Sequence, residues 1–146
     1  MLLADLITEN KNHFTIADYT RVWKEINQVC FDGELSEPKI FLDNDLSHLV
    51  DDPKYFDRFE NGQIIGYCDE DPDDHEIVLL FWNGLSDPRE MIQVVAHEMV
   101  HQALAEKYSY EKMLKLGHGP EFMSYSNTIK AYHNIELFGA SYNETT

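Results

Sequence analysis

The sequence lacks the features that mark disulfide-bonded, membrane-spanning or disordered proteins. It has only two cysteines, Cys30 and Cys68, which form no CxxC pair, and we expect reduced, buried thiols rather than a disulfide. The longest apolar run, at 77–82, is far shorter than the roughly 18 residues that a membrane span needs. Seven glycines and five prolines in 146 residues leave no low-complexity segment.

Basic residues are also scarce: 11 Lys and Arg stand against 27 Asp and Glu, for a net charge of −16. Such a chain repels phosphate backbones, so any contact with DNA is expected to be local or supplied by a partner, and no membrane binding is expected. Residues 43–76 hold 12 acids and two bases, whereas residues 85–146 hold eight acids and five bases. The acidic segment fits either a solvated face or a surface for a basic partner.

Length and composition predict one domain over residues 1–146, with a core at about 15–135 and a frayed tail at 139–146. The first residues carry no basic leader, and Asp5 interrupts their apolar run, so no signal peptide is expected. We therefore expect a soluble, cytoplasmic protein.

The first half of the chain predicts one helix and three strands. Apolar residues recur every three or four positions from 15 to 31, which is typical of an amphipathic helix. Strands are predicted at 39–42, 63–68 and 76–82, the last two as antiparallel neighbours joined by the acidic connection 69–75. A calcium site in that connection is a weak alternative, because the EF-hand pattern is absent. A long loop is expected at 43–61, with a short helix near 53–59.

The second half predicts a buried helix followed by a loop and a last helix. Asp87 and Pro88 are a typical helix start, and the residues up to about 108 are apolar on nearly every side. A loop is expected at 109–117. From Pro120 a last helix is predicted, with one apolar stripe made of Phe122, Tyr125, Ile129 and Tyr132. The fold class is therefore α+β: a small three-stranded antiparallel or mixed sheet packed on a buried helix, with N- and C-terminal helices.

The buried helix contains the run His97-Glu98-Met99-Val100-His101. Residues four apart lie on the same side of a helix, so both imidazoles can reach one metal ion, with Glu98 beside the open ligand position. Leaving these groups unpaired in an apolar helix would cost several kcal/mol. The motif therefore predicts a zinc site.

A hydrolytic zinc site needs a third protein ligand. The metzincin spacing is excluded, because Leu104 and Lys107 stand where that class has glycine and histidine. His118, between two glycines and just before Pro120, is the favoured ligand, and Glu121 is the alternative.

Together, the histidine motif and the run 117–122 (Gly-His-Gly-Pro-Glu-Phe) resemble the SprT-like zinc metalloprotease domain, which includes the Spartan proteases that degrade proteins crosslinked to DNA. Asn27, the run 31–35 (Phe-Asp-Gly-Glu-Leu) and the pair Gly66-Tyr67 also match, so the resemblance covers about 15–135. It implies a zincin-like fold and one Zn²⁺ ion. The implied ligands are His97, His101 and His118, with Glu98 as the catalytic base.

The main hypothesis is thus a zinc-dependent endopeptidase that cleaves a protein or peptide lying along an edge strand. An assisting side chain is not chosen among His133 and five tyrosines (Tyr67, Tyr108, Tyr110, Tyr125 and Tyr132). The alternative is a non-catalytic zinc-binding adaptor whose acidic segment recruits a basic partner, with His75 or His133 as a fourth ligand. An acidic nucleic-acid mimic is a weaker third hypothesis.

Overall fold

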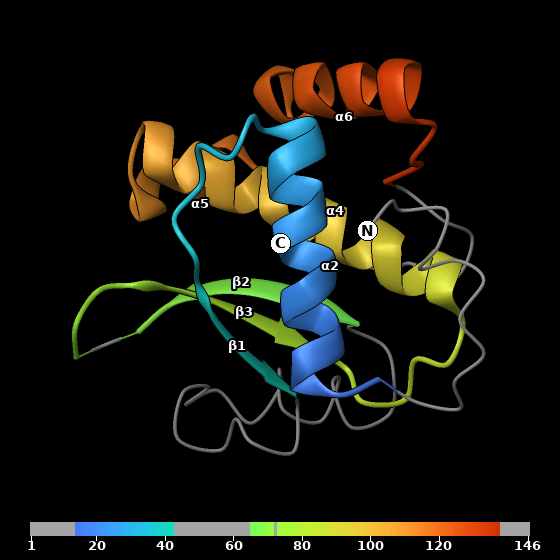
Figure 1. Ribbon diagram of the computed structural model, residues 1–146. Helices are drawn as coiled ribbons and strands as arrows, with labels where there is room; N and C mark the ends of the chain where they lie inside the picture. The colour runs from blue at the N-terminus through green and yellow to red at the C-terminus, as the bar shows by residue number, and fades with distance from the viewer. Residues whose placement is uncertain (1–13, 43–64, 72, 138–146) are drawn as a thin grey trace.

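The computed structural model describes residues 14–42, 65–71 and 73–137 (Figure 1). This part of the chain has an α+β fold, as predicted. Its elements in chain order are α2 (Ile16–Cys30), β1 (Lys39–Leu42), β2 (Gly66–Glu70), β3 (Ile77–Phe81), α4 (Pro88–Lys107), α5 (Tyr110–Leu116) and α6 (Pro120–His133). The loop and short helix predicted within 43–61, and the frayed tail, lie outside the described residues. None of the described helices is long and apolar enough to cross a membrane.

The three strands form a mixed sheet with β3 in the centre, in the order β1-β3-β2. Strand β1 is parallel to β3, and β2 is antiparallel to it, with Gly66 opposite Phe81 and Glu70 opposite Ile77. The antiparallel pair confirms the prediction. The predicted end of the second strand at Cys68 is wrong, because the strand continues to Glu70. Asp69 is tolerated there because its Oδ1 accepts a hydrogen bond from the backbone N–H of Glu70 at 2.8 Å.

Helix α2 begins with a capping box: Asp18 N–H donates to Thr15 Oγ1, and Thr15 N–H donates to the Asp18 carboxylate. At its other end the Asn27 side chain bonds both the N–H and the carbonyl of Leu35, at 3.1 and 3.2 Å. This pair of bonds closes the turn that leads to β1, and Gly33 allows the turn with a φ of +73°.

Helix α4 is the centre of the fold, as its sequence predicts. Asp87 caps it, Pro88 is its first residue, and every residue from 91 to 105 except Gln93 is buried. Figure 1 shows α4 between the sheet and α6, with α4 packed on β2 and α2 on β1. Its buried Gln102 accepts a hydrogen bond from the Trp23 indole at 3.0 Å and donates to the Ser36 carbonyl at 2.6 Å.

Two predictions for the C-terminal half are wrong. The expected loop 109–117 contains α5, whose N-cap Ser109 accepts a hydrogen bond from the N–H of Lys112. Only Met113 of α5 is buried, so the helix has no apolar stripe that periodicity could reveal. In α6, Phe122 and Ile129 are buried as expected, but Tyr132 is 79% exposed because it lies beyond Ile129, the last buried residue of the helix.

Both cysteines are free thiols, as predicted. Cys68 is buried in β2, whereas Cys30 is only half-buried at the end of α2. Burial raises the pKa of the Cys30 thiol to about 11, so it is protonated and weakly nucleophilic at neutral pH.

Candidate metal centre

Three histidine side chains converge between α4 and the start of α6. His97 and His101 lie one turn apart on α4, and their ring centroids are 5.1 Å apart. The Nε2 atom of His118 lies 3.1 Å from Nε2 of His97 and 3.2 Å from Nε2 of His101. One ligand atom from each of the three residues lies within 4.8 Å of the others, so they could hold one metal ion.

The separations fit a small tetrahedral ion. With Zn–N bonds of 2.0–2.1 Å, two ligand nitrogens at a tetrahedral angle lie about 3.3 Å apart. The two separations that involve His118 match this value. His97 and His101 are buried and His118 is half-buried, so solvent reaches the cluster from the side of His118.

His118 reaches the cluster through the short turn between α5 and α6. Gly117 has a φ of +51°, a conformation that is strained for residues with a Cβ. Gly119 donates its N–H to the Leu116 carbonyl, and a Cβ added at Gly119 would lie 3.0 Å from that oxygen. Pro120 then begins α6. The two glycines that flank His118 therefore serve the tight turn that the sequence analysis expected.

His97 is oriented by the backbone beyond α6. Its Nδ1 atom lies 3.0 Å from the carbonyl oxygen of Leu137, which is fully buried. A carbonyl can only accept, so Nδ1 carries the proton and Nε2 keeps its lone pair for a metal. The chain returns to α4 through Asn134, which adopts the left-handed conformation with φ 54° and ψ 38°. No local sequence pattern indicates this contact, because it uses a backbone atom 40 residues away.

Phe122 forms an apolar wall against the three imidazoles. Its ring centroid lies 4.9, 4.7 and 4.8 Å from those of His97, His101 and His118, and it is fully buried. The periodicity of α6 predicts that Phe122 is buried, but it does not assign Phe122 to the site. The sequence feature that could have indicated this role is the position of Phe122, four residues after His118 and on the inner face of the first turn of α6.

Glu98 lies on α4 beside His97 and is fully buried. Its side chain is against strand β2: a Cβ added at Gly66 would lie 3.0 Å from Glu98 Oε2. The absence of a side chain at Gly66 makes room for this carboxylate. Glu98 thus lies on the same helix as His97 and His101 and against an edge strand of the described sheet.

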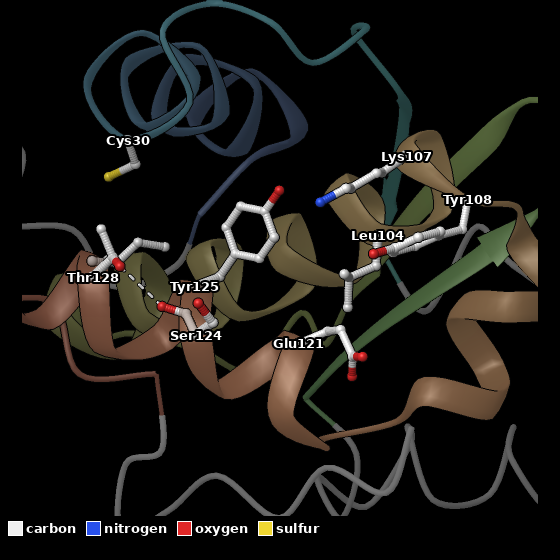
Figure 2. A pocket seen from close by; sticks show the side chains of 9 residues that line it. Cys30, Leu104, Lys107, Tyr108, Glu121, Ser124, Tyr125 and Thr128 are labelled. Carbon is white, nitrogen blue, oxygen red and sulfur yellow. Dashed lines mark hydrogen bonds between the residues drawn. The ribbon is translucent and has the colours of Figure 1, made fainter.

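The alternative ligands are not members of this cluster. Glu121 is exposed and lines a cavity of about 350 Å³ between the ends of α2 and α4 and the first turns of α6 (Figure 2). His75 bonds Glu70 at 3.2 Å on the exposed connection between β2 and β3, and His133 ends α6. The cluster found within the described residues therefore consists of the three predicted histidines.

Tyr110 is one of the tyrosines considered as assisting residues. Its hydroxyl donates to Asp69 Oδ1 at 2.9 Å. Burial, together with the negative charge of Asp69, raises the pKa of Tyr110 well above its usual range, so the hydroxyl stays protonated. Tyr125 lines the cavity of Figure 2, and Tyr108 and Tyr132 are exposed.

The acidic connection between β2 and β3 is held by a lysine. Lys39 Nζ donates to Asp71 Oδ2 at 3.0 Å and also to the carboxylate of Asp74. Hydrogen bonds from the N–H of Asp73 and from Lys39 lower the pKa of Asp71. The ammonium group thus occupies the space between carboxylates where the weak calcium alternative would place an ion.

A comparison with protein families gives a match to the SprT-like family over residues 54–144, more than half of the chain. The chain belongs to the SprT-like family. The matched segment contains all three histidines of the cluster and Glu98, and the family indicates a metalloprotease-like domain. No curated protein and no solved structure gives a significant match.

Proposed function

We propose that this SprT-like chain is a zinc-dependent endopeptidase of zincin-like fold. The observation that carries the proposal is the convergence of three histidine side chains, with Nε2 of His118 at 3.1 and 3.2 Å from Nε2 of His97 and of His101. The buried carboxylate of Glu98 on the same helix supports a catalytic rather than a structural role, because a purely structural site needs no base beside it.

His97, His101 and His118 would hold the ion, and neutral imidazole is a favoured zinc ligand. When bound, zinc polarises a carbonyl and lowers the pKa of a coordinated water toward about 7. The Leu137 carbonyl keeps His97 in the tautomer that binds metal, and the Phe122 wall restricts the rotation of all three rings. The donor set of the described residues thus fits zinc.

In this proposal Glu98 is the general base. It accepts a proton from the water that attacks the carbonyl carbon of the peptide, and it passes a proton to the amine nitrogen when the C–N bond breaks. Its burial against Gly66 holds the carboxylate in one position, so no reorganisation precedes the proton transfer. The half-buried side of the cluster, at His118, leaves room for the substrate.

The substrate would be a polypeptide in extended form, paired with β2. This strand is an edge of the described sheet and packs against α4, and its first residue contacts Glu98. An edge strand offers unpaired backbone groups that can bind a peptide by strand addition. A peptide on β2 would therefore pass close to the proposed base.

The alternative that the sequence left open, a non-catalytic zinc-binding adaptor, is less well supported. A closed structural site needs a fourth protein ligand, and the cluster within the described residues has three members.

Any contact with DNA is proposed to be local or through a partner, given the net charge of −16. Lys107 ends α4 and Lys112 and Lys115 lie in α5, so these exposed lysines are the basic residues nearest to His118 in the chain.

The test is a cleavage assay on a DNA-binding protein, with the full chain loaded with zinc, with and without single-stranded DNA. Glu98→Gln is the matched control, because the amide has the same shape but cannot accept the proton. We expect wild type to cleave, and Glu98→Gln to keep one zinc per chain while losing roughly 10²–10⁴-fold in rate. Equal cleavage by the two proteins would refute the role of Glu98. Zinc binding without cleavage of this or an unfolded substrate would favour the adaptor.

A further inference from the structure

The hydrogen bond between Tyr110 and Asp69 joins α5 to β2. In the proposed function β2 binds the substrate, whereas α5 leads to the metal ligand His118. Tyr110 is the first residue of α5, and its hydroxyl donates to Asp69 Oδ1 at 2.9 Å. Asp69 lies in β2, three residues after Gly66, and Tyr110 lies eight residues before His118. One bond therefore ties the strand that contacts Glu98 to the segment that delivers His118.

Helix α5 is held by its packing on α4, by the partly buried Tyr110 and Leu116, and by the bond from Tyr110 to Asp69. It has seven residues, and within it only Met113 is buried. An isolated helix of this length has no stability of its own, so its position depends on its tertiary contacts. His118 follows α5 after the single residue Gly117, so a shift of α5 moves the imidazole away from His97 and His101.

Partial burial and a charged acceptor both stabilise this hydrogen bond. Asp69 is half-buried, and its Oδ1 accepts from the N–H of Glu70 as well as from Tyr110. A hydrogen bond to a charged acceptor is stronger than one between neutral groups, and partial burial reduces competition from water. Tyr110 keeps its proton at neutral pH, because burial and the charge of Asp69 raise its pKa. The pair is thus a fixed donor and acceptor across the gap between α5 and β2.

We propose that Tyr110 and Asp69 are positioning residues that hold His118 in register with strand β2, and so couple the metal site to the strand that binds the substrate. The part of this proposal that concerns substrate binding rests on the proposed function. The part that concerns metal affinity rests on the histidine cluster alone. Neither residue belongs to the histidine cluster; both act through the placement of α5.

The experiment measures zinc affinity of the full chain by chelator competition, in Tyr110→Phe, Asp69→Ala, Asp69→Asn and the double variant Asp69→Ala/Tyr110→Phe. We expect Tyr110→Phe to weaken zinc binding roughly tenfold, as the loss of a residue that supports a ligand does. Asp69→Asn keeps an oxygen acceptor but loses its charge, so it should weaken zinc binding by clearly less than Tyr110→Phe does. The double variant should be no weaker than the weaker single variant, because both remove the same bond.

Two controls separate positioning from a general loss of stability. Tyr125→Phe makes the same chemical change on α6, at a half-buried tyrosine whose hydroxyl forms no hydrogen bond within the described residues. Val22→Ala destabilises the core through α2, away from the site. Both should keep wild-type zinc affinity, measured below their unfolding temperatures.

The results distinguish this proposal from the proposed function. Unchanged zinc affinity in Tyr110→Phe overturns the positioning role, whether or not the wild type cleaves protein. An equal loss in Val22→Ala, or in Asp69→Asn, overturns it as well. If wild type cleaves, Tyr110→Phe should also raise KM by more than it lowers kcat at saturating zinc, because β2 is no longer tied to the site. If the wild type binds zinc but cleaves no protein, the proposed peptidase function is refuted. The comparison of zinc affinities among the variants still tests the positioning role.

Discussion

Gly66 and Glu98 are in such close contact that even the Cβ atom of an alanine at position 66 would press on the carboxylate. A Cβ placed on Gly66 would lie 3.0 Å from Glu98 Oε2, 3.1 Å from Glu98 Cγ and 3.1 Å from a methyl carbon of Val94. Real Cβ atoms rarely approach neighbours this closely, so an added methyl group moves the carboxylate by a few tenths of an ångström. The glycine of an edge strand therefore sets the position of the proposed base.

Gly66→Ala is predicted to lower kcat roughly tenfold while zinc content stays at one per chain, because a small misplacement of a catalytic group is costly. Steady-state kinetics and metal analysis measure both. The double variant Gly66→Ala/Val94→Ala is the control, since it removes the aliphatic contact and keeps the contact with Glu98. Recovery of activity in the double variant would mean that the effect passes through helix packing and not through the carboxylate.

His118→Ala is predicted to weaken zinc binding by more than roughly a hundredfold, since even residues that only support a ligand are worth 10–100-fold. Glu121→Gln should bind zinc as wild type does, because Glu121 is exposed and lies outside the cluster. Competition with a coloured chelator measures both variants. The reverse pattern, with Glu121 essential and His118 dispensable, would assign the third ligand to the carboxylate.

Removal of zinc by a chelator is predicted to lower the unfolding temperature by roughly 5–10 °C relative to protein in zinc at about a hundred times its Kd. The reason is that the ion binds the folded cluster and not the unfolded chain, in which His118 is far from His97 and His101. Thermal unfolding followed by circular dichroism measures the shift. The triple variant His97→Ala/His101→Ala/His118→Ala should show no response to the chelator, and a response there would point to another metal site.

Lys39→Met is predicted to raise the pKa of Asp74 toward its ordinary value of 3.8, because the hydrogen bond from Lys39 is the main cause of its lowered pKa. A lowered pKa means that the charged carboxylate stabilises the fold above pH 3.8 and that this contribution is lost as the pH falls through the lower folded pKa. Carboxyl chemical shifts followed from pH 6 to pH 2 report the change. Lys24→Met, at an exposed pair with Glu37, should leave the Asp74 titration unaltered.

The sequence determined those features that depend on residues close together in the chain. Asp87 and Pro88 start α4, and the apolar residues on all its sides require burial, so both its start and its central place were predictable. The four-residue spacing of His97 and His101 places both rings on one side of the helix by geometry alone. Glycine on each side of His118 indicated the tight turn.

Only the tertiary structure decided the features that join distant segments. Helix α5 was missed because a seven-residue helix with one buried side chain carries no periodic signal. The bonds from Tyr110 to Asp69 and from His97 to the Leu137 carbonyl span 41 and 40 residues, and no local pattern encodes such pairings. The contact of Gly66 with Glu98 likewise depends on how α4 packs over β2. The sequence named the metal-binding groups, and the packing of α5, β2 and the segment after α6 decided how they are held.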